Sequence, residues 1–194
     1  MGRARESSPV SQSLPPHEQP GPLGQLIRFD RALFRALTAY RPERVTGFVR
    51  WITGLGDTRA WVILGIVCAF SGSGGQELAW IMVLGGLLSV TSTNLLKFAV
   101  QRPRPFEAGL DRRLINEPFG NSFPSGHSTQ AMTIVCAVGV LYPNVAAPLY
   151  CLGLAIALSR IYLGVHFPLD VILGVALGSI LGPATVAFAE FIAY

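Results

Sequence analysis

The sequence predicts an all-α, integral-membrane helical bundle with five transmembrane helices, or six as an alternative, preceded by an N-terminal amphipathic interfacial helix. Of its 194 residues, 51% are hydrophobic and only 13% are charged, whereas a soluble domain usually carries roughly 25% charged residues. Five apolar segments approach the length of about 20 residues that a helix needs to cross a bilayer. The length predicts one compact bundle without a second domain of useful size.

Three regions follow one another along the chain. Residues 1–22 are predicted to be a disordered tail, because five prolines among Ser and Gln residues cannot build a core. Residues 23–57 are predicted to be an amphipathic, interfacial helical region, in which 45–55 form a second interfacial or partly inserted piece. Residues 58–194 form the transmembrane domain. In the interfacial region, the apolar face holds Leu26, Ile27, Phe29, Leu33, Phe34 and Leu37, and the other face holds Arg28, Arg31 and Arg35.

The apolar segments of the transmembrane domain cover about residues 58–71, 77–100, 126–142, 145–163 and 168–192. In the last segment, Gly174, Gly178 and Gly182 recur every four residues, a spacing that lets helices approach closely. We interpret this spacing as tight packing within the chain rather than as a dimer interface. Three cysteines in apolar runs, without metal-binding spacing, are interpreted as reduced core residues: Cys68, Cys136 and Cys151.

The alternation of segments places the polar loops on one membrane face. The only long polar loop, residues 101–125, joins the second and third segments there, and the loop between the fourth and fifth segments returns to the same face. Ionisable groups at such a boundary are energetically expensive and usually functional. Three polar clusters converge on this face: Lys97 with Arg102 and Arg104; Pro124, Ser125, Gly126 and His127; and Ser159, Arg160, His166 and Asp170.

The second cluster opens a helix, whose first-turn N–H groups and positive dipole end favour an anion. Gly126 permits close approach of a phosphate oxygen to the backbone, and Ser125 adds a hydroxyl donor. His127 can donate a proton to a leaving oxygen. A capped helix start with a polar interfacial histidine explains the tetrapeptide equally well.

In the third cluster, His166 and Asp170 are four residues apart across a helix start. A carboxylate that accepts from one imidazole nitrogen fixes the tautomer and leaves the other nitrogen free to attack. Arg160 can offer a planar fork to phosphate. The alternative is a structural ion pair between Arg160 and Asp170. For the first cluster taken alone, a topology anchor is the favoured interpretation.

Together these residues resemble the three-part signature of the type 2 phosphatidic acid phosphatase superfamily. The signature reads Lys, six residues, Arg-Pro; then Pro-Ser-Gly-His; then Ser-Arg, five residues, His, three residues, Asp. Every position is present between Lys97 and Asp170. The resemblance implies a membrane lipid phosphatase that hydrolyses a phosphate monoester or diphosphate, of a polyprenyl phosphate, phosphatidate or phosphatidylglycerophosphate type, without a metal or other cofactor.

The resemblance also implies roles. His166 would form a phosphohistidine, Asp170 would orient it, and His127 would protonate the leaving group and then activate water. A ring of donors would neutralise the charge that spreads over the phosphoryl oxygens. This phosphate-binding set would comprise Lys97, Arg104, Ser125, Gly126 and Arg160.

Two other functions remain as alternatives: a vanadium-haloperoxidase-like enzyme, and a non-catalytic membrane protein that binds anionic lipid. The expected partners are a lipid phosphate substrate and the bilayer, with no nucleic acid, and the sequence does not assign an oligomeric state. All fifteen Lys and Arg residues lie on the face of the long loop or in segments leading to it. The positive-inside rule therefore predicts an inner (plasma) membrane protein with its site at the cytoplasmic face.

Overall fold

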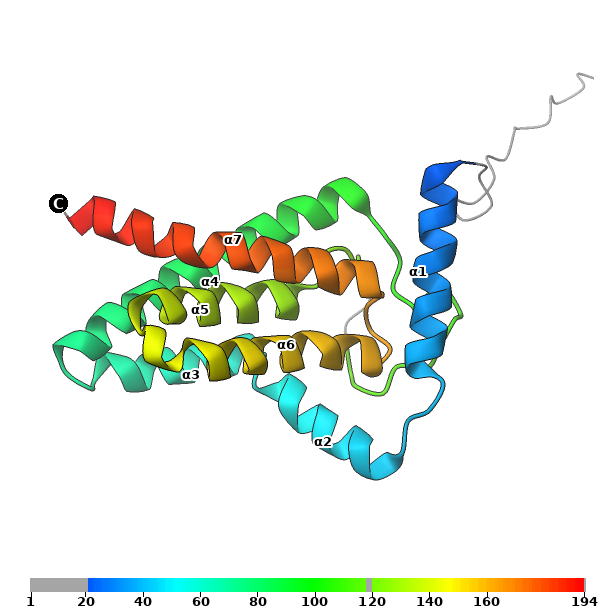
Figure 1. Ribbon diagram of the computed structural model, residues 1–194, viewed down its shortest axis with the longest axis horizontal. Coiled ribbons are helices and arrows are strands. Elements are labelled where there is room, and N and C mark those ends of the chain that lie inside the picture. Colours follow the sequence, from blue (N-terminus) through cyan, green and yellow to red (C-terminus); the bar gives the residue numbers. More distant parts are fainter. Residues whose placement is uncertain (1–20, 118–119, 194) are drawn as a thin grey trace, which may run out of the picture.

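The computed structural model describes residues 21–117 and 120–193, which form an all-helical bundle (Figure 1). These residues contain no β-strand, so the predicted all-α class is confirmed. The predicted disordered tail, residues 1–22, lies outside the described residues except for Gly21 and Pro22, and Pro22 begins the first helix. The elements are α1 (Pro22–Thr38), α2 (Glu43–Gly54), α3 (Thr58–Ala69), α4 (Ser73–Val100), α5 (Gly126–Leu141), the 3-10 turn η1 (Pro143–Val145), α6 (Ala146–Tyr162) and α7 (Pro168–Ala193).

Helix α5 is the centre of the bundle, and Figure 1 shows it between α6 and α7. Eleven of its sixteen residues are buried, which is far more than a helix facing lipid on one side would bury. Two of its buried hydroxyl groups are satisfied within the helix, since those of Thr129 and Thr133 donate to carbonyl oxygens four residues earlier, at 3.0 and 2.8 Å. Its apolar residues Met132 and Val135 pack against Ile156 of α6.

Helix α7 packs closely against α5 through three glycines spaced four residues apart. A Cβ on Gly174 would lie 2.8 Å from the Ser125 carbonyl oxygen, and one on Gly182 would lie 2.6 Å from the Cys136 Cβ. A Cβ on Gly178 would collide with the Thr129 carbonyl oxygen. The prediction that these glycines serve packing within the chain is therefore confirmed.

Three helical stretches are long and apolar enough to cross a membrane: α4, the continuous stretch Pro143–Tyr162, and the α7 stretch Pro168–Ile192. Helices α2 and α3 pass the same test only as a pair bent by 51°. At 1.5 Å per residue, the twelve residues of α3 extend about 18 Å, against a hydrocarbon core of about 30 Å. Helix α5 is apolar but has sixteen residues. The described residues thus provide three or four candidate spans, and the predicted count of five is not confirmed.

The outer surface of the bundle is apolar, as a lipid environment requires. Large side chains exposed on it include Ile63, Leu95, Phe98, Leu158 and Ile180. All three cysteines are free, with Cys136 buried and Cys68 partly buried, but Cys151 is exposed. The prediction that all three are core residues is wrong for Cys151, because this side of α6 faces outward.

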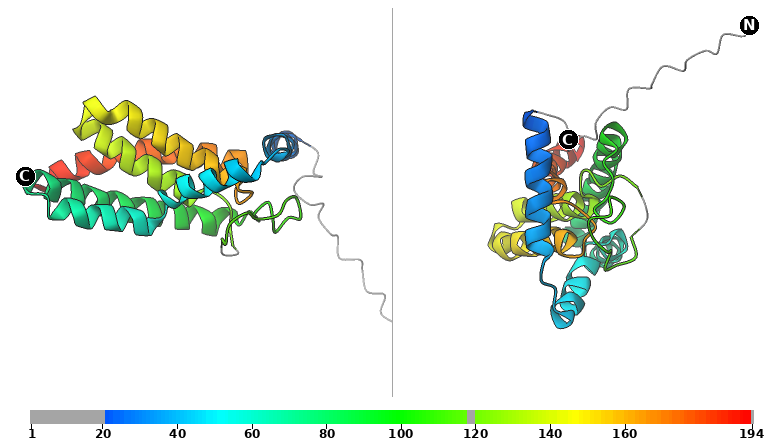
Figure 2. Two further views of the ribbon diagram at one scale, coloured as in Figure 1. Left: turned by 90° about the horizontal axis from the view of Figure 1, so that it is seen from below. Right: turned by 90° about the vertical axis from the view of Figure 1, so that its right-hand side faces the viewer.

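Helix α1 lies across one end of the bundle, roughly perpendicular to the long helices (Figures 1 and 2). Leu23 and Phe29 are exposed, while Asp30 and Phe34 are buried against the bundle. The Phe34 ring meets the Phe167 ring edge-on, with centroids 5.4 Å apart. This orientation is the one expected of a helix on a membrane surface, and its contact with lipid stays a prediction.

Candidate active site

The three polar clusters of the sequence meet at the end of the bundle that α1 covers. Lys97 lies in the last turn of α4, and His127 lies in the first turn of α5. Arg160 lies in the last turn of α6, and Asp170 in the first turn of α7. Figure 1 shows these helix ends on the same side, where loop residues 101–117 and 120–125 also lie. Helix direction alone thus brings residues from four elements together.

A tight turn at the end of α6 positions His166. The Arg160 carbonyl oxygen accepts hydrogen bonds from the N–H groups of Val165 and His166, both at 3.3 Å. Gly164 has a φ of 78°, a left-handed conformation that favours glycine, and a Cβ there would lie 2.8 Å from Asp111 Oδ2. The spacing of five residues between Arg160 and His166 is therefore the length that this turn needs to reverse the chain.

His166 and Asp170 are buried side by side, with 1% and 0% of their side chains exposed. The His166 Nδ1 atom is 3.7 Å from Asp170 Oδ2, which is beyond hydrogen-bond length. The same Oδ2 accepts from the Phe167 N–H at 2.9 Å. Burial lowers the pKa of His166 to about 4, although Asp170 opposes this shift. The imidazole is therefore neutral near pH 7.

The alternative Arg160–Asp170 ion pair is not formed. Asp170 pairs instead with Arg102, whose Nη1 donates to Oδ1 at 2.7 Å. Arg160 pairs with Glu117, donating from Nη2 to Oε2 at 2.7 Å, and it also donates from Nη1 to the Thr53 hydroxyl group of α2 at 2.7 Å. Arg102 and Arg160 thus pair with different carboxylates.

Glu117 bridges the two predicted phosphate-binding arginines. Its second oxygen, Oε1, lies 3.1 Å from Arg104 Nη1, and Arg104 and Arg160 are only 4% and 1% exposed. Burial would raise the pKa of Glu117, but Arg160 and Arg104 outweigh it and lower the pKa to about 2. Sequence reasoning missed this residue, because nothing distinguishes it from Glu107 and Asp111 in the same loop.

His127 contacts a second residue that the sequence analysis missed. Its Nε2 atom lies 2.8 Å from Oδ1 of Asp57, at the bend between α2 and α3. The hydrogen bond with His127 is the main reason that the pKa of Asp57 is lowered. In the sequence, Asp57 looks like an ordinary N-cap before an apolar run. In the structure it makes no side-chain cap bond, and its carboxylate is available to His127.

The start of α5 faces Lys97 across a small pocket of about 150 Å³. A Cβ on Gly126 would lie 3.8 Å from Lys97 Nζ, so the amine is close to the first turn of the helix. Ser125 is fully buried, its N–H donates to the Asp170 carbonyl oxygen at 3.0 Å, and its Oγ accepts from the Ser128 hydroxyl group at 2.8 Å. A helix N-terminus beside an ammonium group is a favourable place for an anion.

The predicted site residues are therefore neighbours, arranged around two sub-sites. One holds His166, Asp170 and the Arg104–Arg160 pair, which Glu117 bridges. The other holds Lys97, Gly126 and His127, which line the pocket. Within residues 21–117 and 120–193, no group of three or more His, Cys, Asp or Glu residues is placed to hold a metal ion.

Known proteins resemble this chain in sequence and in fold. The pattern of the PAP2 superfamily matches residues 77–192. The lipid A 1-phosphatase of Rhizobium etli is 32% identical over 164 residues, which cover 71% of this chain and 68% of that protein. The decaprenylphosphoryl-5-phosphoribose phosphatase of Mycobacterium tuberculosis is 34% identical over 127 residues, covering 63% and 67%.

Two crystal structures resemble the bundle. Aquifex aeolicus LpxE superposes with a TM-score of 0.70 at 29% identity, covering 80% of this chain and 93% of that one. A PAP2-type phosphatidylglycerolphosphate phosphatase from Bacillus subtilis superposes with a TM-score of 0.72 at 26% identity, covering 87% and 88%. The matched signature, the helix ends that gather it and these relatives agree, and the chain belongs to the PAP2 superfamily of membrane phosphatases.

Proposed function

We propose that the protein removes phosphate from a lipid phosphate monoester or diphosphate through a phosphohistidine intermediate. The observation that carries the proposal is the convergence of Arg104 and Arg160 on one carboxylate, that of Glu117, in a buried site that also holds His166. Two guanidinium forks on one anion have the charge and geometry that phosphoryl oxygens need. The Glu117 oxygens stand in for two phosphoryl oxygens and leave when the substrate binds.

In the first step, the Nε2 atom of His166 attacks phosphorus. A nitrogen–phosphorus bond forms as the bond to the leaving oxygen breaks, and His127 gives its proton to that oxygen. Asp170 stabilises the positive charge that develops on the His166 ring, because its carboxylate faces Nδ1. The phosphoryl oxygens are held by Lys97, Arg104, Arg160, the Ser125 hydroxyl group and the Gly126 N–H group.

In the second step, a water molecule replaces the departed lipid. His127, now neutral, takes a proton from this water, and the resulting hydroxide attacks phosphorus. The nitrogen–phosphorus bond breaks, which releases inorganic phosphate and restores neutral His166. The low pKa of His166 supports this cycle, because the free ring starts neutral with an electron pair available.

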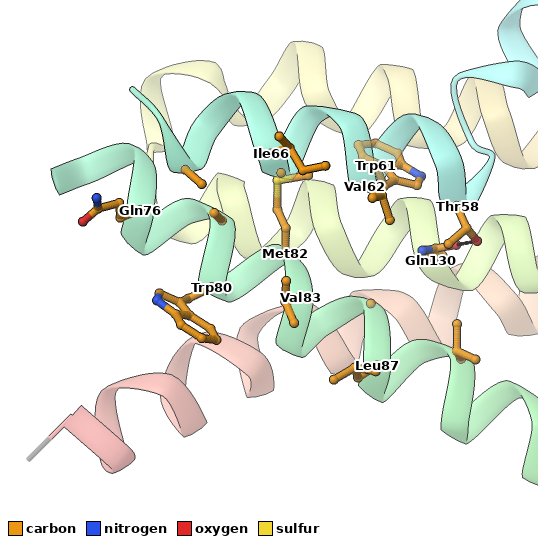
Figure 3. Close-up of a pocket in the computed structure, with 15 residues that line it drawn as sticks. Thr58, Trp61, Val62, Ile66, Gln76, Trp80, Met82, Val83, Leu87 and Gln130 are labelled. Atoms are coloured by element: carbon orange, nitrogen blue, oxygen red, sulfur yellow. Dashed lines mark hydrogen bonds between the residues drawn. The ribbon is translucent and has the colours of Figure 1, made fainter. Parts of the chain in front are cut away.

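An apolar groove of about 520 Å³ between α3 and α4 supports a lipid as the substrate (Figure 3). It shares Thr58, Val90 and Gln130 with the smaller pocket beside Lys97 and His127. An acyl or prenyl chain lying in the groove would therefore bring its phosphate toward the site. The apolar side chains that Figure 3 shows along the groove include Trp61, Val62, Ile66, Trp80, Met82, Val83 and Leu87.

The relatives are named for different lipids: lipid A, a decaprenylphosphoryl phosphoribose and, in Bacillus subtilis BcrC, undecaprenyl diphosphate. Each of these names gives a phosphorylated lipid. We therefore propose a long-chain lipid phosphate as the substrate class, and the panel below separates the headgroups.

Phosphate release from a panel of lipid phosphates tests the function. The panel comprises phosphatidate, phosphatidylglycerophosphate, farnesyl diphosphate, undecaprenyl diphosphate and lipid A. Wild type is expected to release phosphate from at least one member, and His166→Ala should lose activity by at least about 10⁴-fold, because the nucleophile is gone. A ³²P-labelled substrate should label wild type at His166 and leave His166→Ala unlabelled. Equal release by both proteins would refute the assigned nucleophile.

We further propose that the protein resides in the inner (plasma) membrane with its site at the cytoplasmic face. Arginines that have no place in the mechanism, among them Arg50, Arg59 and Arg112, belong to the site end, which supports this orientation. The test replaces the three native cysteines, including exposed Cys151, and introduces Asn116→Cys in the exposed loop. An impermeant maleimide should label Asn116→Cys in inside-out vesicles only. Labelling from the outside of intact cells would reverse the orientation.

A further inference from the structure

Asp30 of α1 is a buried carboxylate that the mechanism above does not use. It is 1% exposed, although α1 lies at the surface of the bundle. On the helix it falls within the apolar face, four residues from both Leu26 and Phe34. A carboxylate in that position is unfavourable unless strong partners satisfy it. Its partners therefore indicate why it is there.

One oxygen of Asp30 contacts the start of α7, and the other contacts Arg102, which pairs with Asp170 of α7. Oδ1 accepts from the Leu169 N–H group at 2.9 Å, and Oδ2 accepts from Arg102 Nη2 at 2.5 Å. The other nitrogen of the same guanidinium, Nη1, donates to Asp170 Oδ1 at 2.7 Å. One arginine fork thus joins a carboxylate of the surface helix to a carboxylate of the site.

The two oxygens of the Asp170 carboxylate have different partners. Arg102 takes Oδ1, and the remaining oxygen, Oδ2, faces His166 Nδ1. The Arg102 guanidinium also lies 4.1 Å from the centre of the Phe167 ring, which fixes the fork against the residue next to His166. Asp30 of α1 therefore contacts Leu169 directly and Phe167 through Arg102, so it holds the residues on both sides of Pro168.

We propose that Asp30 and Arg102 are a positioning pair that fixes the Asp170 carboxylate, and through it the nucleophile His166, so that the surface helix α1 is part of the catalytic apparatus. Asp30 acts in two ways. It orients the Arg102 guanidinium so that the other nitrogen of the guanidinium donates to Asp170, and its negative charge offsets the positive charge of Arg102. Without the charge of Asp30, the Arg102 cation would be balanced by Asp170 alone. The negative charge of Asp170 would then stabilise the positive charge on the His166 ring less during attack.

The inference rests on the proposed function, and kinetics of purified full-length variants on dioctanoyl phosphatidate and on the fastest substrate of the panel test it. Asp30→Asn keeps the shape but loses the charge, and it should lower kcat about 10- to 100-fold with KM within about threefold of wild type. Arg102→Lys has one nitrogen in place of a fork, cannot contact both carboxylates as Arg102 does, and should lower kcat similarly. Asp30→Glu should recover part of the loss.

A double-mutant cycle tests whether the two residues act as one unit. Asp30→Asn in the Arg102→Lys background should lower kcat by less than threefold further, because the bridge to Asp170 is already lost. Additive losses in kcat would show that the residues act separately and would overturn the pair. Should Asp30→Asn fail to fold, Arg102→Lys and Asp30→Glu carry the same comparison.

Arg41→Gln provides the matched control for a merely structural ion pair. Arg41 pairs with Asp111 at 2.6 Å at the same end of the bundle, with side chains 10% and 16% exposed, and neither contacts α7 by an ion pair. This variant should lose thermal stability with kcat unchanged. If Asp30→Asn behaves like Arg41→Gln while His166→Ala is inactive, the positioning role is refuted and the proposed function stands. If His166→Ala is fully active, the proposed function itself fails.

Discussion

At the scale of single residues, the two histidines of the site have different environments. His166 is fully enclosed, and its pKa of about 4 keeps it neutral. His127 is 22% exposed, and a carboxylate contacts its Nε2 atom at 2.8 Å. A nucleophile needs a free electron pair, and an acid–base group needs access to the leaving oxygen and to water. The difference in burial therefore matches the difference in proposed roles.

The depressed pKa of His166 predicts a dependence of stability on pH. The unfolded chain takes up a proton at His166 near pH 6.5, whereas the folded protein does not until about pH 4. Stability is therefore lost as the pH falls from 6.5 toward 4, by on the order of 1–2 kcal/mol at pH 5. Glu117 contributes little to the loss at pH 5, because its stabilisation is lost mainly as the pH falls below its unfolded pKa of 4.5 toward its folded pKa of about 2.

Thermal unfolding in detergent at pH 7 and pH 5 measures this effect. The drop in Tm between the two pH values should be smaller for His166→Asn, which cannot titrate, than for wild type. An equal drop in both proteins would mean that His166 titrates normally in the folded state.

Glu117 is expected to compete with phosphate for the two arginines. In Glu117→Gln the competing charge is gone, and inorganic phosphate should inhibit turnover several-fold more strongly than it inhibits wild type. Glu107→Gln is the control, because Glu107 lies in the same loop but accepts from the N–H groups of Arg104 and Gly120 rather than from guanidinium groups. Unchanged or weaker inhibition of Glu117→Gln would contradict the competition.

At the scale of elements, the packing of α7 on α5 sets the geometry of the site. The Ser125 N–H donates to the Asp170 carbonyl oxygen at the point where both helices begin. The glycines of α7 let this close approach continue along the helices. The bend of α2 against α3 has a comparable effect, since it places Asp57 at His127. A Cβ on Gly56, beside this bend, would meet the His127 ring at 3.3 Å.

Gly178→Ala tests the α5–α7 contact. The added methyl group would collide with the Thr129 carbonyl oxygen, and neither backbone can yield without separating the helices. We expect a loss of about 1–3 kcal/mol of stability, seen as a lower Tm in detergent, together with reduced kcat. Gly47→Ala in α2 meets no atom within 4 Å. This control should be neutral or slightly stabilised, because Ala favours a helix over Gly. Equal behaviour of the two variants would argue against tight α5–α7 packing.

At the scale of the whole molecule, the apolar groove adjoins the pocket beside Lys97 and His127, because the two share three lining residues. The groove lies along α3 and α4, and the anion site lies where α4 ends and α5 begins (Figures 1 and 3). We therefore expect a lipid substrate to keep its chain among the apolar side chains while its phosphate enters the pocket beside Lys97 and His127. We expect this arrangement to favour long-chain substrates over soluble phosphate esters.

Val83→Trp tests this arrangement by narrowing the groove. We expect the KM for a long-chain lipid phosphate to rise about tenfold, which corresponds to a loss of about 1.4 kcal/mol in binding free energy. Turnover of p-nitrophenyl phosphate should stay unchanged. Leu173→Trp, on the exposed side of α7 and outside the groove, is the matched control and should leave both substrates unaffected. If Val83→Trp leaves the KM for the lipid unchanged, the groove does not bind the chain.

The span count shows what hydrophobicity alone does not decide at this scale. The sequence predicts that segment 126–142 crosses the membrane, and α5 is an apolar helix of sixteen residues with eleven of them buried, so this span is not confirmed. A protein core and a lipid chain are equally apolar, so hydrophobicity alone does not distinguish them. Only the packing of α4, α6 and α7 around α5 shows which environment it has.

The sequence by itself determined the helical class, the membrane character, the glycine packing of α7 and the family. These features depend on local patterns: apolar segment length, spacing between glycines, and the turn that separates Arg160 from His166. The tertiary structure alone decided which charges meet. Asp30 with Arg102, Asp57 with His127, and Glu117 with Arg160 are pairs whose members lie in different elements, and Glu117 also meets Arg104 across thirteen residues of their shared loop. Their contacts depend on how the helices pack, and short-range sequence patterns do not record that packing.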